Sequence, residues 1–138
     1  MDTPVEYMEI AVAGLHLSGQ PLNHQLTSLG SRLKRKCTTS AEYKMYLVKD
    51  ARGEKPGLIR LTGGRKGSAF ELEIWEVPFE NAGKFISMIP QPLGIGTLNL
   101  QDGTQVKGFI CEPCVMEESE DISRFSGWRE FVKAKEIE

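Results

Sequence analysis

The stretch MEIAVAGLHLSGQPLNHQL, residues 8–26, predicts a buried strand that ends in a polar loop and leads into a helix. Residues 8–13 are mostly apolar, as in a buried strand, and the Gly and Ser residues that follow mark a loop. Leucines then recur at helical spacing from Leu22, and the helix is expected to end near Leu29, before Gly30. This strand, loop and helix form the first unit of the predicted fold.

Six more strands are expected further along the chain. Within residues 70–77, the even positions up to Ile74 are apolar and are expected to face the core, whereas the opposite face is mixed. Asp102 and Gly103 are typical of a tight hairpin turn between the last two strands. Apolar, β-branched and aromatic runs, and one basic run with a solvated side, place these strands at residues 32–36, 43–48, 57–61, 70–77, 95–100 and 105–111.

Two further helices are expected. One begins at Pro78, where proline and an acidic residue occupy favoured N-terminal positions, and ends near Met88, before two prolines. The other is capped near Asp121 or Ser123 and is amphipathic up to Val132. About seven strands with two or three helices include too many adjacent strands for a doubly wound sheet. They predict an α+β fold, with a mixed sheet or small β-barrel and flanking helices.

The composition is that of an ordinary globular domain. The 138 residues are 40% hydrophobic and 26% charged, which predicts a single domain over residues 1–138 with an ordered core over about residues 8–134. A net charge of −2, from 17 basic and 19 acidic residues, lacks the basic footprint of a nucleic-acid binder. No apolar run approaches the ~20 residues that span a bilayer, and the acidic N-terminus is unlike a signal peptide. We therefore expect a cytoplasmic protein without nucleic-acid or membrane partners.

The three cysteines are expected to be structural or incidental. Cys111 and Cys114 have the C-x-x-C spacing found in zinc and redox sites, and Cys37 stands apart. A zinc site needs a second pair of ligands, and both histidines lie far upstream. The sequence therefore predicts no bound metal, no cofactor and no disulfide framework.

The polar loop at residues 14–25 holds both histidines of the chain, His16 and His24. A loop between a strand and a helix N-terminus exposes backbone N–H groups that suit a carboxylate or another small anion. Histidine titrates near neutral pH, so His16 beside such a seat is suited to moving a proton. The alternative is that His16 is a hydrogen-bonded interior histidine and His24 a surface residue of the helix.

Three other positions suit either a binding site or a structural role. Arg60 can pair with the carboxylate of a substrate or with an acidic neighbour on the surface. Glu73 shares this ambiguity, and the glycines of residues 92–97 suit either a turn or the wall of a pocket. The sequence holds no G-x-S-x-G motif, which disfavours covalent acyl transfer.

Five longer motifs stand out along the chain: AGLHLSGQPLNHQL (13–26), KPGL (55–58), PQPLGIG (90–96), VKGF (106–109) and DIS (121–123). Together they resemble the C-terminal domain of allophanate hydrolase, over about Met8 to Phe131. In allophanate hydrolase this domain follows an amidase domain, and the present chain resembles the C-terminal domain alone. The resemblance implies a γ-glutamylcyclotransferase-like fold, a small barrel with flanking helices.

Cyclotransferase activity itself is not expected. Members of the fold with this activity use a glutamate after the helix that follows the central strand, and the corresponding IPQP (89–92) holds no acidic residue. They also begin the loop with Tyr-Gly-Ser/Thr-Leu, and the tyrosine of that motif is replaced here.

For the allophanate hydrolase domain, the resemblance implies decarboxylation of N-carboxycarbamate, in urea catabolism and nitrogen metabolism. The chain would then be a lyase-type enzyme with His16 as the proton donor and His24 in reserve. The implied substrate-binding residues are Leu17, Ser18, Gly19, Gln20 and Asn23 of the loop, Arg60 as a second clamp, and Gly94, Ile95 and Gly96 of the wall.

A second hypothesis is a non-catalytic module that uses the same surface to bind an anion or to assemble with a separate amidase, because a fold does not determine a function. The presence of His16 within the complete loop favours chemistry. The absence of an amidase domain from the chain favours an accessory role. A homodimer is compatible with either hypothesis.

Overall fold

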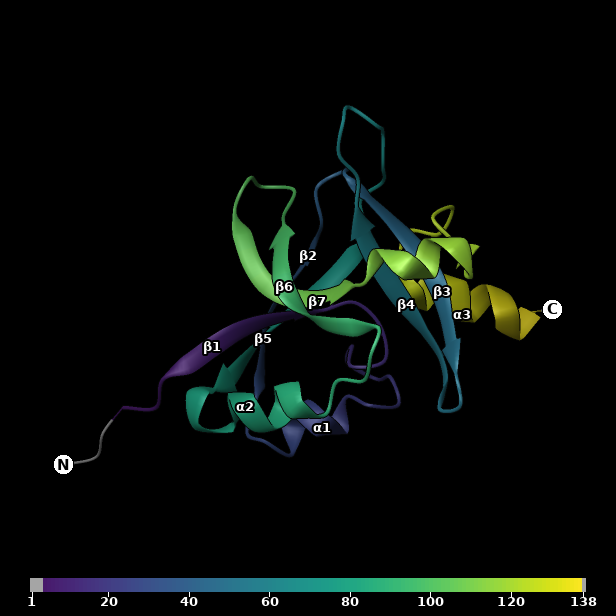
Figure 1. Cartoon of the computed structure of the whole chain (residues 1–138). Helices are drawn as coiled ribbons and strands as arrows, with labels where there is room; N and C mark the ends of the chain where they lie inside the picture. The colour runs from purple at the N-terminus through teal and green to yellow at the C-terminus, as the bar shows by residue number, and fades with distance from the viewer. Residues whose placement is uncertain (1–3, 138) are drawn as a thin grey trace.

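The computed structural model describes residues 4–137, which form two β-sheets with helices around them (Figure 1). The strands of the larger sheet are β1 (Tyr7–Val12), β2 (Arg32–Thr38), β5 (Glu71–Pro78), β6 (Leu93–Asn99) and β7 (Gln105–Cys111). Their spatial order is β2-β5-β1-β7-β6. Strands β1 and β7 are parallel, whereas the other neighbours are antiparallel. The first strand of the chain is therefore the centre of the sheet.

A smaller antiparallel sheet lies beside the larger one. It consists of β3 (Tyr43–Asp50), β4 (Gly53–Arg60) and the short β8 (Glu120–Asp121), in the order β4-β3-β8. Strands β3 and β4 form a long hairpin, seen at the right of Figure 1, and β4 also contacts β7. This contact brings the hairpin against the central part of the larger sheet.

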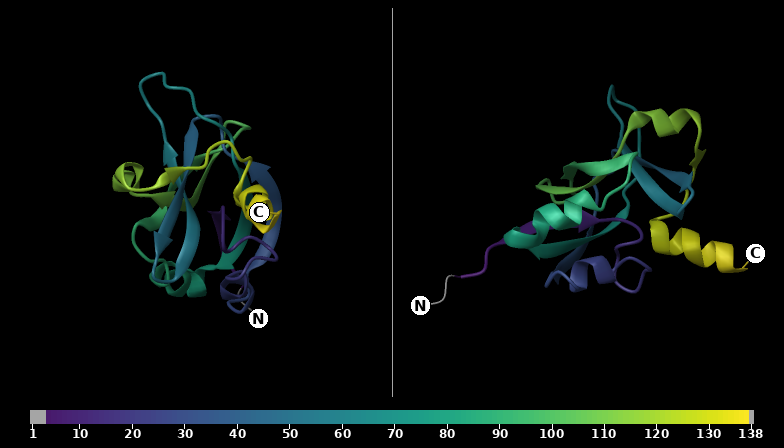
Figure 2. Two further views of the ribbon diagram at one scale, coloured as in Figure 1. Left: turned by 90° about the vertical axis from the view of Figure 1, so that its right-hand side faces the viewer. Right: turned by 60° about the horizontal axis from the view of Figure 1, so that its bottom comes forward.

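The helices lie at two ends of the molecule. Helix α1 (His24–Thr27) and helix α2 (Phe79–Ser87) lie close together, whereas α3 (Trp128–Ile137) lies near the β3–β4 hairpin (Figures 1 and 2). A short 3-10 helix, Pro113–Glu117, follows β7. Within residues 4–137, none of the helices has both the length and the apolar character that a membrane span requires.

The core surrounds β1 and β5. Residues 10–12 of β1 are fully buried, which accounts for an apolar run without alternation. On β5, Leu72 and Ile74 are fully buried, as the alternating pattern predicts. On the opposite face, which the sequence predicted to be mixed, Glu73, Trp75 and Val77 are buried and Glu71 is half-buried. Strand β5 is therefore covered on both sides.

The expected strands are confirmed, including the exposed basic strand β2 and the hairpin between β6 and β7, where Gly103 has a φ of +88°. The first helix is shorter than predicted. Residues 14–23 form successive turns, in which the N–H groups of Leu17, Gln20 and Asn23 each donate to the carbonyl three residues earlier. These turns leave a single helical turn for α1.

The last helix begins later than predicted. Asp121 belongs to β8, and its carboxylate accepts the backbone N–H of Ser123 at 2.8 Å. Both expected caps are therefore used in a strand and a turn, and α3 begins at Trp128. Ser126 lies just before α3, and its backbone N–H donates to the carboxylate of Glu130, which belongs to the first turn of α3, at 2.8 Å.

Candidate functional site

A cavity of about 330 Å³ lies beside His16. Its walls come from the loop after β1, helix α1, the tip of the β3–β4 hairpin, and the segment from the end of α2 to the first residue of β6, with one residue from β7. The polar side chains of the lining are those of His16, Gln25, Asp50, Arg52, Glu54 and Lys55. The apolar lining residues are Ala13, Leu15, Pro21, Leu22, Pro56, Met88, Pro90, Leu93 and Phe109. A mostly apolar cavity with a few polar groups is typical of a small-molecule site.

His16 is fixed in this cavity by two aromatic rings and one hydrogen bond. Its imidazole stacks on Phe109, with ring centroids 5.1 Å apart, and meets Phe85 edge-on at the same distance. The Nε2 atom lies 2.7 Å from Gln25 Oε1. Because an amide oxygen only accepts hydrogen bonds, Nε2 carries a hydrogen and donates it to Gln25. The nitrogen that gains and loses the titrating proton is therefore Nδ1.

Burial lowers the pKa of His16 below its ordinary value of 6.5. The hydrogen bond to Gln25 opposes this shift, and a charge on His24 would add to it. At neutral pH the side chain is therefore mostly a neutral imidazole. An anion bound in the cavity would favour the imidazolium form and would raise the pKa again.

The hairpin reaches the loop because of Gly14. A Cβ atom at this position would lie 2.4 Å from Cδ of Pro56, at a distance that real Cβ atoms do not show. Glycine thus permits Pro56 of β4 to contact the start of the loop. This contact makes the hairpin tip a wall of the cavity.

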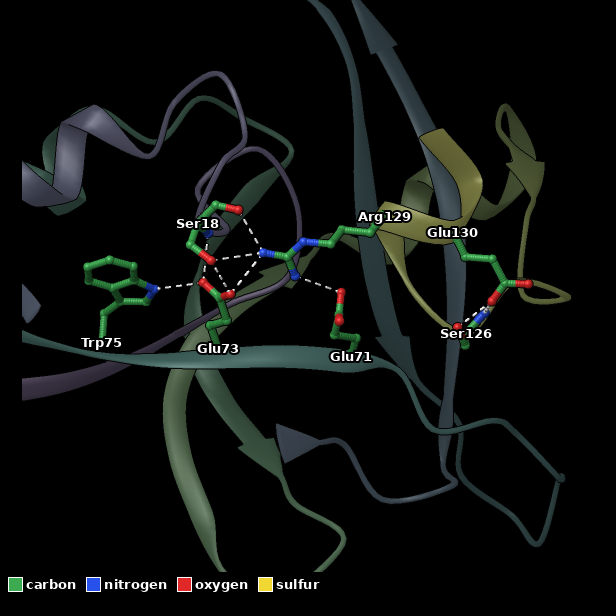
Figure 3. A network of polar contacts seen from close by, with 7 residues as sticks. All are labelled: Ser18, Glu71, Glu73, Trp75, Ser126, Arg129 and Glu130. Carbon is green, nitrogen blue, oxygen red and sulfur yellow. Dashed lines mark hydrogen bonds and ion pairs between the residues drawn. The ribbon is translucent and has the colours of Figure 1, made fainter. Parts of the chain in front are cut away.

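A second polar cluster fastens the other side of the loop to β5 and α3 (Figure 3). The fully buried Glu73 carboxylate accepts hydrogen bonds from Ser18 N–H at 2.7 Å, Ser18 Oγ at 2.6 Å and Trp75 Nε1 at 3.1 Å. Arg129 of α3 pairs with Glu73 and with Glu71, both at 2.9 Å. The same guanidinium donates to the carbonyl oxygen of Ser18 at 2.7 Å.

This cluster keeps Glu73 ionised. Burial alone would raise the pKa of Glu73, but the hydrogen bonds from Ser18, Trp75 and Arg129 hold it below its ordinary value. Figure 3 shows that these side chains point toward one another from three different segments of the chain. The ambiguity over Glu73 is therefore resolved in favour of an ion pair inside the protein.

Most of the loop positions expected to bind an anion make hydrogen bonds within the protein. Leu17 is fully buried and its N–H donates to Gly14, whereas the Ser18 N–H donates to Glu73. Asn23 Nδ2 donates to the carbonyl oxygen of His16 at 2.8 Å. These contacts shape the loop. None of Leu17, Ser18, Gly19, Gln20 and Asn23 is among the residues that line the cavity.

The other expected site residues also lie away from the cavity lining. Arg60 is at the far end of β4 and pairs with Glu42 at 3.7 Å. His24 is exposed, and its Nδ1 lies 3.0 Å from the Pro21 carbonyl oxygen. The wall predicted at Gly94, Ile95 and Gly96 is supplied instead by Leu93, because β6 begins there and pairs with β7. Of the sequence-predicted residues, the structure places only His16 in the cavity.

The hairpin tip is the part of the site that sequence reasoning missed. It contributes Asp50, Arg52 and Lys55 to the cavity, more than thirty residues away from His16 along the chain. The one signal in the sequence was the KPGL motif (55–58), which belongs to the resemblance and had been given no role.

The cysteines take no part in the cavity. All three are free thiols, and burial is the main cause that raises the pKa of Cys111 to about 11, with smaller contributions from Cys114 and Glu112. Among residues 4–137, no three side chains of His, Cys, Asp or Glu are grouped in a way that would hold a metal ion.

Comparison with known proteins gives consistent results. The profile of the allophanate hydrolase C-terminal domain family matches residues 8–133. A urea amidolyase of Lachancea kluyveri is 41% identical over 133 residues, which cover 94% of this chain and 7% of that protein. A structure of Kluyveromyces lactis allophanate hydrolase superposes with a TM-score of 0.87 and 39% identity, over 94% of this chain and 21% of that one.

A third relative has nearly the same extent as this chain. The structure of a uropathogenic E. coli-specific protein superposes with a TM-score of 0.83 and 28% identity, over 92% of this chain and 96% of that one. The chain therefore spans a small part of the two yeast proteins and almost the whole of the bacterial one. Together these likenesses confirm the α+β, γ-glutamylcyclotransferase-like fold expected from the sequence.

Proposed function

Since the chain belongs to the allophanate hydrolase C-terminal domain family, we propose that it decarboxylates N-carboxycarbamate, or a related carbamate-like dianion, in the cavity beside His16. The relatives are named urea amidolyase and allophanate hydrolase, which supports a place in urea and allophanate degradation. The substrate would come from an amidase that removes ammonia from allophanate, and the reaction would take place in the cytoplasm.

The reaction needs one proton and no cofactor. The bond between the nitrogen and one carboxylate carbon breaks, and that carboxylate leaves as CO2. The bonding electrons stay on the nitrogen, which takes a proton from Nδ1 of His16 and leaves carbamate as the second product. His16 then regains a proton from water. Charge balances, because a dianion and a proton become a neutral gas and a monoanion.

The observation that carries this proposal is the environment of His16. Its imidazole is held between Phe85 and Phe109 and bonded to Gln25, inside a mostly apolar cavity. A neutral imidazole there becomes a proton donor when a dianion enters, since the nearby negative charge favours the imidazolium. The apolar walls favour loss of charge as a carboxylate becomes CO2.

The test is CO2 release from N-carboxycarbamate, generated in the assay by an amidase acting on allophanate. We expect His16→Asn to retain the fold and to slow release by ~10²–10⁴-fold, the usual contribution of a positioned acid or base. The His24→Asn exchange compares the two histidines directly. A loss in His24→Asn without a loss in His16→Asn would assign the donor to His24.

A non-catalytic role is the second candidate. It is favoured by exposed apolar side chains on α2. Phe79 and Ile86 are 56% and 37% exposed and lie two helical turns apart. If the wild-type protein binds a dianion without accelerating CO2 release, it is a binding or assembly module for a separate amidase.

A further inference from the structure

We propose that Arg52, at the tip of the β3–β4 hairpin, holds the carboxylate that remains in the product, and that this contact makes the cavity selective for small dicarboxylates over monocarboxylates. The inference rests on the proposed function, which it deepens by assigning the anion-binding residue. Arg60, the arginine that the sequence suggested, is paired with Glu42 outside the cavity.

Each charged side chain of the hairpin wall other than Arg52 has an oppositely charged partner among the described residues. Lys55 is buried, with only 7% of its side chain exposed, and its ammonium pairs with the carboxylate of Asp50. Glu54 pairs with Lys135 of α3. Over residues 4–137, no carboxylate lies within ion-pair distance of the Arg52 guanidinium. Arg52 is therefore the cation of this wall that is available to a ligand.

The backbone at Arg52 is held in place by its neighbours. Oδ1 of Asp50 accepts the backbone N–H of Arg52 at 2.8 Å, while Oδ2 binds the Lys55 ammonium. Gly53 has a φ of +124°, a left-handed value that allows the chain to turn back into β4. The contact between Gly14 and Pro56 then holds the hairpin against the loop that carries His16. Arg52 is thus presented at the rim of the cavity by a braced turn.

This placement gives the two carboxylates of a dianion different surroundings. Guanidinium binds carboxylate through two parallel hydrogen bonds, so Arg52 stabilises a carboxylate that keeps its charge. The walls formed by Leu15, Met88 and Phe109 are apolar and favour the carboxylate that becomes neutral CO2. Arg52 would therefore retain the carbamate half while the other half leaves.

Malonate is a suitable probe, because it replaces the N–H group of N-carboxycarbamate by CH2 and does not break down at that bond. Isothermal titration calorimetry of the whole chain with malonate and with acetate measures the selectivity. We expect Arg52→Gln to weaken malonate binding by about tenfold or more, since a lost charge-assisted hydrogen bond has this effect. The loss should be smaller for acetate, because its single carboxylate can bind beside protonated His16 instead of at Arg52.

Arg65→Gln is the matched control, because Arg65 is exposed in the loop after β4 and bonds only to the Thr62 carbonyl among the contacts of the described residues. It should bind malonate like the wild-type protein. Melting temperatures of both variants report whether the fold is retained. Since Arg52 is exposed, Arg52→Gln is expected to fold.

The proposal is overturned if Arg52→Gln binds malonate as tightly as wild type, or if wild type does not prefer malonate to acetate. It is also overturned if Arg60→Gln weakens malonate binding and Arg52→Gln does not. CO2 release separates this inference from the proposed function. If the wild-type protein releases CO2 and Arg52→Gln retains this rate in full, the proposed decarboxylase activity stands and the role of Arg52 is overturned. If Arg52→Gln loses its preference for malonate and the wild-type protein does not release CO2, the role of Arg52 in binding stands and the decarboxylase proposal is overturned.

Discussion

At the scale of single residues, the pKa of His16 couples anion binding to protonation. The imidazole is mostly neutral in the empty cavity because burial lowers its pKa below 6.5. A dianion stabilises the imidazolium, so the complex binds a proton that the free protein lacks. The other charged groups of the cavity are Arg52, the Asp50–Lys55 pair and the paired Glu54, and His24 lies nearby.

We predict that malonate binding tightens as the pH falls from about 8 to about 6.5, since proton uptake on binding favours the complex at lower pH. Calorimetric titrations at several pH values give the dependence, and measurements in two buffers of different ionisation enthalpy count the protons taken up. In His16→Asn the dependence should be flat over this range. Equal slopes for the two proteins would show that a group other than His16 takes up the proton.

At the scale of elements, α3 is fastened to the loop and to β5 by one arginine. Arg129 bonds to Glu71, Glu73 and the carbonyl oxygen of Ser18. Removal of the guanidinium would leave the fully buried Glu73 without its cation, and an unpaired buried charge is costly. The pairing thus holds together segments that are more than fifty residues apart in sequence.

We predict that Arg129→Met lowers the free energy of unfolding by about 3–5 kcal/mol, the usual cost of breaking a buried pair. Urea denaturation at neutral pH measures it. Arg124→Met removes an exposed ion pair with Glu120 and should cost less than about 1 kcal/mol. The pKa of Glu73 is lower in the folded state than in the unfolded state. Ionised Glu73 therefore contributes to the free energy of unfolding at pH values above its unfolded pKa, and this contribution is lost as the pH falls through its folded pKa. The difference between wild type and Arg129→Met should therefore shrink in acid.

The contact between the first loop and the β3–β4 hairpin also belongs to this scale. In Gly14→Ala, the added methyl group would overlap the ring of Pro56, and the hairpin must move. We predict a loss of about 1–3 kcal/mol of stability, as for other overpacked positions, together with weaker malonate binding. Gly83→Ala is the control, because α2 has open space there and a helical alanine is favoured over glycine. Equal melting temperatures for Gly14→Ala and wild type would contradict the close contact.

At the scale of the whole molecule, one hydrophobic cluster joins both sheets and α3. It includes Ile10 of β1, Ile74 of β5, Met45 of β3, Leu58 of β4 and Phe131 of α3. A core shared in this way leaves neither sheet able to bury its apolar face alone. The bacterial relative, of which the match covers 96%, has the same fold at nearly this length.

We predict that the chain unfolds in a single cooperative transition, with an enthalpy of about 95 kcal/mol near 60 °C, from about 0.7 kcal/mol per residue. Differential scanning calorimetry tests this prediction through the agreement of the calorimetric and van't Hoff enthalpies. A second transition would show that the β3–β4 hairpin and α3 form a separate unit.

The sequence by itself determined the strands β1 to β7, the exposed basic face of β2, the β6–β7 hairpin and the family. Each of these rests on residues close together in the chain: apolar alternation, a turn at Gly103, or a continuous motif such as the loop with His16. Only the tertiary structure decided the partners of that loop. The β2-β5-β1-β7-β6 order and the packing of β4 on β7 bring Arg52 to the cavity and Arg129 to Glu73. Local periodicity states which side chains are buried but not which distant segment covers them, because that choice is made by the packing of the complete core.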